Sequence, residues 1–179
     1  MPVASSITES EIVFPGKPLP ATSTVFIDDV SGPAANLTMD WDVIVFNKRW
    51  QSAFTELTSG VNVIQWTFCH PAARESFLDW DTAAQGLLTW WVAGISKRGE
   101  SERTRSIART CVAVNPSFER MWDAFETEAL DRYLKVELPG AESAPTKLLF
   151  GLTTQVTTVA PDYCTLAGFT VPPTALQRD

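Results

Sequence analysis

The sequence predicts one α+β domain: a five-stranded antiparallel sheet with a helical block inserted between the second and third strands and packed on one face. Strand-like runs occur near the start of the chain, at 36–47, and again near its end, at 133–171. The residues between them show helical periodicity with repeated helix-start signals. A length of 179 residues with 45% hydrophobic residues suits a single domain with a sizeable core.

The N-terminal residues 1–34 form a proline-rich segment that we expect to be extended. The prolines stand at Pro2, Pro15, Pro18, Pro20 and Pro33. This density argues against a helical domain. The run 24–27 could add an edge strand, the folded domain is expected over 35–173, and residues 174–179 are expected to form a loose tail.

A hairpin followed by a helix is predicted next. Residues 36–40 alternate with period two, and 41–47 are β-branched and aromatic, so we expect two strands joined around Asp40. Asn47 is a typical N-cap for a helix over 48–57, with Trp50, Phe54 and Leu57 on one face.

The helical block continues from residue 61. Residues 61–68 are apolar and of undetermined type, and Pro71 opens a short helix that ends near residue 78. A longer helix begins at Asp79 or Asp81 and runs to about residue 96, before Gly99.

Two more helices complete the block. The segment 101–114 places apolar residues on one face, and Asn115 followed by proline starts the last helix. The apolar residues expected to face the core are Ile107, Cys111 and Val114, then Phe118, Met121, Trp122 and Phe125. We expect the arginines at 103, 105 and 109 on the solvated face, interleaved with Glu100 and Glu102.

Three strand-like runs end the chain. Residues 133–138 alternate, 147–158 are apolar and then rich in Thr and Val, and 163–171 precede two prolines. We expect these runs to form an antiparallel meander.

Charge and composition exclude several classes of function. The net charge is −7 and no run of Lys and Arg occurs, which disfavours direct nucleic-acid binding and binding to an anionic membrane surface. No apolar run could span a bilayer, and the first residues lack the features of a signal peptide. The three cysteines have no metal-ligand spacing and are expected in the core, so we expect a cytoplasmic protein.

The sequence contains no catalytic constellation. The single histidine, His70, lies next to Cys69, which would point to the opposite face if both were on a strand. No phosphate-binding loop or metal motif occurs. The carboxylate pairs Asp79/Asp81 and Glu137/Glu142 are explained by a helix start and a solvated strand face. We therefore expect no enzyme activity, no cofactor and no metal.

Aromatic residues are the unusual part of the composition. Seven Trp and ten Phe stand against only two Tyr, and such residues fill either a core or an apolar pocket between sheet and helices. The sequence does not separate these two roles. Our candidate ligand-binding aromatics are Phe46, Trp66, Phe68, Phe77, Trp91, Phe118, Trp122 and Phe150.

Three motifs, in order, resemble the ligand-binding domain of MmyB-like transcription regulators. They are Trp41-Asp-Val-Ile-Val-Phe-Asn47, then Phe68-Cys-His-Pro-Ala-Ala-Arg74 with Asp79-Trp80, and Asn115-Pro-Ser-Phe-Glu-Arg-Met-Trp122. The resemblance covers about residues 37–172. It implies a PAS-like sensor domain for a fatty-acid-like or other small apolar molecule, usually fused to a helix-turn-helix domain in bacterial regulators. Arg74 could hold a ligand carboxylate, although pairing with Asp79 or Glu75 is the alternative.

The chain departs from the family pattern at three places. Residues 1–34 do not fit a helix-turn-helix domain, the His-Pro loop before the last strands is replaced by 139–145, and Val61 stands where an arginine is common. We therefore expect a stand-alone sensor of a small apolar ligand, which signals to a protein partner or as a homodimer in transcription regulation. The alternatives are an interaction module whose cavity is filled by Trp and Phe, and a small isomerase-like enzyme.

Overall fold

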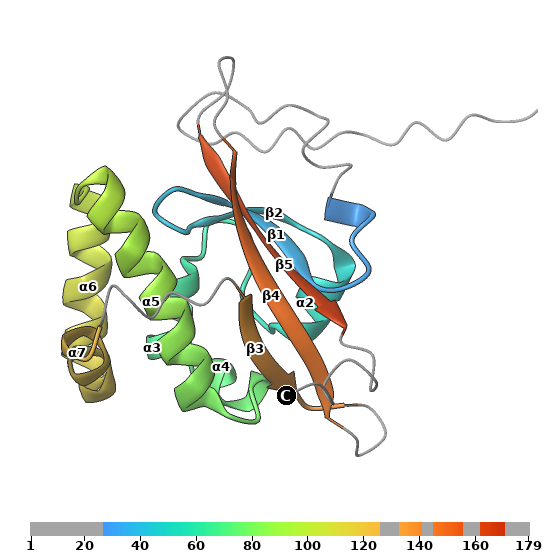
Figure 1. The fold of residues 1–179 in the computed structure, drawn as a ribbon. Coiled ribbons are helices and arrows are strands. Elements are labelled where there is room, and N and C mark those ends of the chain that lie inside the picture. The colour runs from blue at the N-terminus through green and yellow to red at the C-terminus, as the bar shows by residue number, and fades with distance from the viewer. Residues whose placement is uncertain (1–26, 126–132, 141–144, 156–161, 171–179) are drawn as a thin grey trace, which may run out of the picture.

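A five-stranded antiparallel sheet in the order β2-β1-β5-β4-β3 organises the fold (Figure 1). The computed structural model describes residues 27–125, 133–140, 145–155 and 162–170. The strands are β1 (Ala34–Thr38), β2 (Val43–Phe46), β3 (Tyr133–Leu138), β4 (Thr146–Gln155) and β5 (Tyr163–Thr170). The predicted fold class is confirmed, with all the helices after β2 placed before β3.

The register places the N-terminal hairpin beside the C-terminal meander. β1 pairs with β2 on one side and with β5 on the other, so that Leu37 lies opposite both Val43 and Cys164. β4 joins β5 to β3, and Phe150 lies opposite Leu134 and Gly168. β3 has the predicted bounds, and the predicted extension of β4 to residue 158 lies outside the described residues.

Each helix begins at a polar residue that caps its first turn. The helices are α2 (Lys48–Ala53), α3 (Val63–Cys69), α4 (Pro71–Ser76), α5 (Trp80–Arg98), α6 (Glu102–Val114) and α7 (Pro116–Asp123). Their caps are Asn47, Asn62, His70, Asp79, Ser101 and Asn115, whose side chains accept hydrogen bonds from backbone N–H groups of the first turn. Such bonds satisfy groups that a helix start would otherwise leave unpaired.

Two predicted helix ends were wrong. α2 ends at Ala53 rather than at residue 57, because the chain turns at Phe54 so that the indole N–H of Trp50 donates to the Leu57 carbonyl at 3.0 Å. α4 ends at residue 76, because Phe77 is extended and the N–H of Leu78 donates to the carbonyl of Glu137 on β3 at 2.9 Å.

The stretch of undetermined type at 61–68 is mostly helical, as α3. The side-chain oxygen of Asn62 accepts from the N–H groups of Ile64 and Gln65, both at 3.1 Å.

One expected core residue of α6 was misplaced: Val114 is 57% exposed, because it is the last residue of the helix, whereas Ile107 and Cys111 are buried as expected.

Asn47 joins the segment before β1 to the sheet and to α2. Its oxygen accepts from the N–H groups of Ala34 and Trp50, and its amide donates to the carbonyls of Ile27 and Gly32, all within 3.1 Å. Ile27 lies in a short helical turn and packs with Val30 on the sheet. The edge strand expected over 24–27 is absent at residue 27, and residues 24–26 lie outside the described part.

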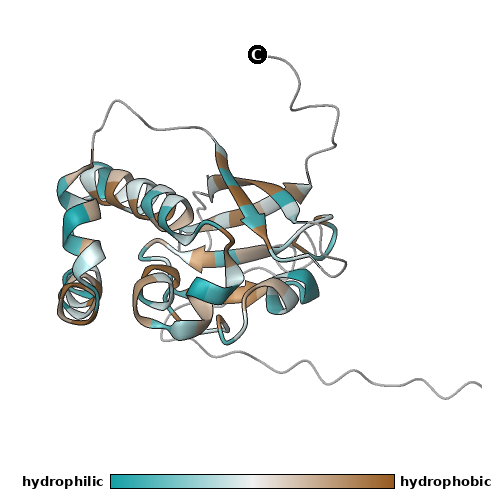
Figure 2. Cartoon of the chain, turned by 90° about the horizontal axis from the view of Figure 1, so that it is seen from below, coloured by the Kyte–Doolittle hydropathy of each residue, from teal (hydrophilic) through white to brown (hydrophobic). Residues whose placement is uncertain are grey.

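The helices form two layers beside the sheet. α3 and α5 lie nearer the strands, with α5 in contact with β3, while α6 and α7 pack on their far side (Figure 1). Hydrophobic and hydrophilic residues alternate along the strands and helices, as expected for elements that are buried on one side (Figure 2). No helix in the described residues is long and apolar enough to cross a membrane.

The turn between β1 and β2 is fastened to α6. A carboxylate oxygen of Asp40 accepts from the hydroxyls of Ser101 and Thr104, at 2.9 and 3.0 Å. Asp42 forms an ion pair with Arg103 at 2.6 Å. The arginine face expected to be solvated is thus partly engaged, and the sheet and the outer helical layer are linked by charge-assisted hydrogen bonds.

Candidate ligand-binding interior

Five aromatic side chains meet between the inner face of the sheet and the short helices α2, α3 and α4. We call Trp50, Phe54, Trp66, Phe77 and Phe150 the aromatic cluster. The ring of Phe54 lies at its centre, with centroids 4.8 Å from Trp50, 5.6 Å from Phe77, and 6.0 Å from both Trp66 and Phe150. All five side chains are buried.

The cavity within this cluster is small in the structure. It holds about 20 Å³, roughly the space of one water molecule. Small-molecule pockets are usually about 300–1,000 Å³. The lining adds aliphatic residues of α3, α5 and the sheet to the aromatic cluster. The full lining is Trp50, Phe54, Leu57, Val63, Trp66, Thr67, Phe77, Leu87, Leu134, Val136, Phe150 and Leu166.

The polar groups at this cavity are already engaged. The indole N–H of Trp50 donates to Leu57 as described, and that of Trp66 donates to the carbonyl of Thr55 at 3.1 Å. The hydroxyl of Thr67 donates to the carbonyl of Val63 at 2.8 Å. A molecule inside would therefore meet only carbon and already bonded groups, which suits an alkyl chain and not a charged head group.

An open groove lies beside α2 and α4, the helices that end just before Phe54 and Phe77. It holds about 740 Å³ and is walled by residues 31–33, α2, α4 and the adjoining ends of β3, β4 and β5; we call it the mouth groove. Leu138 and Leu148 contribute apolar surface to it. Ala53 and Ser76 line it as well, and each directly precedes a cluster residue, Phe54 or Phe77.

Three predicted ligand-binding residues come together in this interior, and the others lie elsewhere. Trp66, Phe77 and Phe150 line the cavity. The predicted residues that do not line it include Phe46, which packs partly buried against the core at the end of β2.

Four predicted aromatics form a separate chain within the helical layers. Phe68 contacts Phe118 at 4.9 Å between ring centroids, Phe118 contacts Trp122 at 5.7 Å, and Trp122 contacts Trp91 at 6.0 Å. These rings pack helices α3, α5 and α7 together. The indole N–H of Trp91 also donates to the carbonyl of Asp40, in the turn between β1 and β2, at 3.4 Å.

Arg74 lies away from both cavity and groove. Its guanidinium carbon is 3.8 Å from the centroid of the Trp80 ring, a cation–π contact. Ion pairs with Asp79 and Glu75, the expected alternative, are not formed among the described residues. The contact joins two residues of the second motif.

Sequence reasoning missed Trp50, Phe54 and Leu57 as cavity residues. Their shared helical face was visible in the sequence, and it pointed to burial without showing against which layer. The alternation of β3 likewise marked Leu134 and Val136 as inward-facing. The available signal was the apolar face of the short helix that follows β2, because this face packs toward the sheet.

The residues considered for catalysis have structural roles. His70 caps α4 through Nδ1, and its Nε2 lies 3.0 Å from Glu56. Asp79 caps α5, and its pKa is lowered by the hydrogen bonds from Thr82. Glu137 pairs with Lys147 at 3.2 Å, and Glu142 lies outside the described residues. No group of three metal-ligating side chains occurs in the described part of the chain.

Cys111 and Cys164 are buried thiols, and Cys69 is partly buried. Cys69 and Cys111, on α3 and α6, have their sulfur atoms 3.9 Å apart, and burial raises the pKa of both. Burial also raises the pKa of Cys164, on β5, to about 12. Because Cys69 ends a helix rather than a strand, the reason given for its separation from His70 was wrong. The two side chains nevertheless make different contacts.

The sheet, the helical block and the aromatic interior between them define a small α+β domain built around an apolar interior. The chain belongs to the MmyB-like transcription regulator ligand binding domain family, whose sequence profile matches residues 21–140. The PAS domain of Bordetella pertussis BvgS is a structural neighbour with 7% identity and a TM-score of 0.40, over 86% of this chain and 87% of that one. No curated protein sequence matches the chain.

Proposed function

We propose that this domain senses a small apolar, fatty-acid-like molecule and signals its presence to a protein partner in transcription regulation. The observation that carries the proposal is the aromatic cluster, an apolar interior with no free polar group that borders an open groove. Membership of a family of regulator ligand-binding domains supports it. The proposal includes no catalytic step.

Ligand entry requires the interior to open. Phe54 and Phe77 lie at the ends of α2 and α4, where the chain has left the helical conformation. Turning their rings would therefore not break a helix. An alkyl chain that buried about ten methylenes would gain about 8 kcal/mol. This corresponds to a dissociation constant near 1 μM before the cost of moving the two rings is subtracted.

An interaction module is the second candidate, and the small size of the cavity favours it. A space of about 20 Å³ is what a domain with an aromatic-filled interior would have. The outer face of the sheet also carries exposed aromatic side chains, Tyr133 at 50% and Phe169 at 47%. A homodimer or a protein partner on this face would need no ligand.

Dodecanoic acid distinguishes the two candidates. In the sensor it should raise the melting temperature progressively with concentration, and native mass spectrometry should show one acid bound per chain. In the interaction module neither effect occurs, and Phe169→Asp would weaken self-association in sedimentation experiments. An unchanged melting temperature at saturating acid, together with an empty domain in native spectra, would rule out the sensor.

A further inference from the structure

We propose, building on the proposed function, that the ligand is a single-chain acid whose head group is held by Lys48 and Arg49 in the mouth groove. The interior offers the alkyl chain carbon surface and no unpaired polar partner. A polar head group buried there would lose its hydration without replacement. It must therefore remain where the interior borders solvent.

The mouth groove lies next to the cluster at the ends of α2 and α4, where neighbouring residues line one or the other. Its wall residues Ala53 and Ser76 precede the two rings that close the interior, Phe54 and Phe77. Its apolar surface from Leu148 lies on the β4 strand that also carries Phe150. A chain that entered beside these rings would pass from the groove, next to Leu148, to Phe150 in the interior.

The charges of the groove favour an acid. Lys48 and Arg49 lie on α2, both exposed and both lining the groove. No carboxylate of the described residues forms an ion pair with either of them. Arg49 donates one hydrogen bond, from Nη1 to the Val30 carbonyl at 3.2 Å, which holds its side chain in place while other N–H groups stay available.

Two acidic residues, Glu56 and Glu75, also line the groove, and neither forms an ion pair with Lys48 or Arg49. A carboxylate oxygen of Glu56 lies 3.0 Å from Nε2 of His70. Glu75 lies on α4, on a different wall of the groove from Lys48 and Arg49. Lys48 and Arg49 thus place two adjacent cations, without carboxylate partners among the described residues, on the α2 wall of the groove, which suits a carboxylate head group.

The test compares three ligands that share one alkyl chain: dodecanoate, dodecanol and dodecylamine. Binding to the purified protein is followed by its tryptophan fluorescence, to which Trp50 and Trp66 of the aromatic cluster contribute. We expect the wild type to bind dodecanoate more tightly than the other two. The double variant K48A/R49A should bind dodecanoate roughly 3- to 30-fold more weakly, as expected for two solvent-exposed ion pairs, and dodecanol unchanged.

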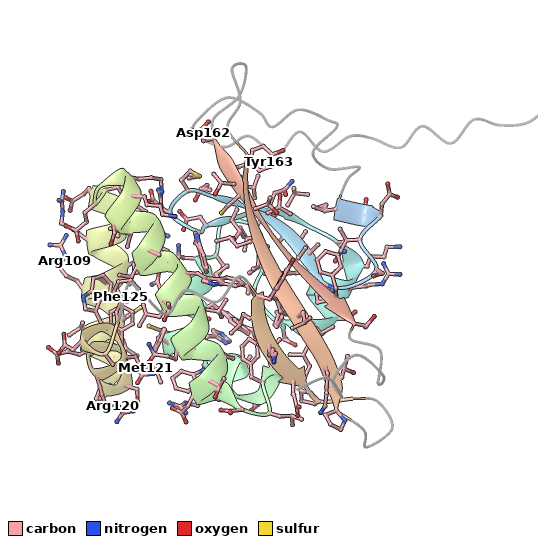
Figure 3. The ribbon with its side chains drawn as sticks, viewed as in Figure 1. Arg109, Arg120, Met121, Phe125, Asp162 and Tyr163 are labelled. Atoms are coloured by element: carbon pink, nitrogen blue, oxygen red, sulfur yellow. The ribbon has the colours of Figure 1, made fainter. Side chains whose placement is uncertain are left out.

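The control K97A/R109A removes the same charge from α5 and α6, and Arg109 lies on the outer side of the helical layers (Figure 3). It should bind all three ligands like the wild type. Lys48→Ala alone, which keeps the Arg49 hydrogen bond, should show part of the loss and a wild-type melting temperature. The wild-type preference for dodecanoate should also shrink as salt is raised.

The results that would overturn the inference distinguish failure of the head-group site from failure of the sensor. Equal binding of dodecanoate and dodecanol by the wild type, or wild-type binding of dodecanoate by K48A/R49A, refutes the head-group site and leaves the sensor intact. Preference for dodecylamine assigns the head-group contact to Glu75 instead. Failure of all three ligands to bind refutes the sensor and, with it, the head-group site.

Discussion

Truncation of Phe54 is the most informative change in the aromatic cluster. Its ring contacts four other aromatic rings and is 4% exposed. Phe54→Ala should destabilise the domain by about 3–5 kcal/mol, through lost burial and the cavity left behind. For a chain of this size, that lowers the melting temperature by roughly 6–20 °C. Chemical denaturation with circular dichroism measures the loss.

The same change should make the interior more receptive to a ligand. Removing the ring enlarges the cavity of about 20 Å³ toward the size that is known to admit benzene, about 150 Å³. Dodecanoic acid at ten times its dissociation constant should then restore about 1.4 kcal/mol. The acid should also bind this variant more tightly than the wild type, because one ring no longer has to move.

Phe118→Ala is the matched control. Phe118 is 1% exposed and contacts Phe68 and Trp122 in the helical layers, away from the cavity. It should cost a similar amount of stability without any gain in acid affinity. If the two variants respond to the acid alike, or if Phe54→Ala binds it more weakly than the wild type, the assignment of the ligand space to the aromatic cluster is wrong.

Three further predictions follow from single groups. Asn47→Ala removes four hydrogen bonds at a 3% exposed site and should lower the free energy of unfolding by about 3–5 kcal/mol. Asn115→Ala removes two hydrogen bonds at a half-buried site and should lower it by about 1–2 kcal/mol. Urea unfolding measures both losses, and equal losses would contradict this prediction. Cys164 has a pKa raised by burial to about 12, so it should react with a disulfide reagent at pH 8 only on unfolding, and fast labelling of the native protein would show that it is accessible. The pKa of Glu102 is lowered chiefly by a hydrogen bond from Arg105. The stability that this carboxylate contributes is therefore complete above the unfolded pKa of about 4.3, and it is lost as the pH falls through the lower folded pKa. Glu102→Gln should flatten the acid side of the curve of stability against pH, and an unchanged curve would refute the coupling.

The sequence predicted the elements that carry their own local signals. Asn47 and Asn115 cap helices where the sequence placed them, and the alternation of β3 gave both its ends. The order of strands and helices predicted the antiparallel sheet with its inserted helices, but not the strand order β2-β1-β5-β4-β3. In these places the local preference and the tertiary structure agree, which makes prediction possible.

The predictions were incomplete or wrong where tertiary contacts decide the secondary structure of a segment or the layer that a side chain faces. The β-branched start of α3, at Val63 and Ile64, is helical because Asn62 caps it and the helix packs on α5 and α6. Aromatic residue type indicated burial at Phe68 and Phe118 without showing which layer they face. Hydrophobicity predicts that a side chain is buried, and its period predicts which face of a helix or strand is buried. Neither predicts which element packs against that face.

A crystal structure of the protein with dodecanoic acid tests the central claim most directly. We expect the alkyl chain between the sheet and α2 and α4, against Phe150, with the rings of Phe54 and Phe77 turned from the positions described here. The carboxylate should lie in the mouth groove. A chain bound on the outer face of the sheet, or an aromatic cluster that stays closed at saturating acid, would contradict the account.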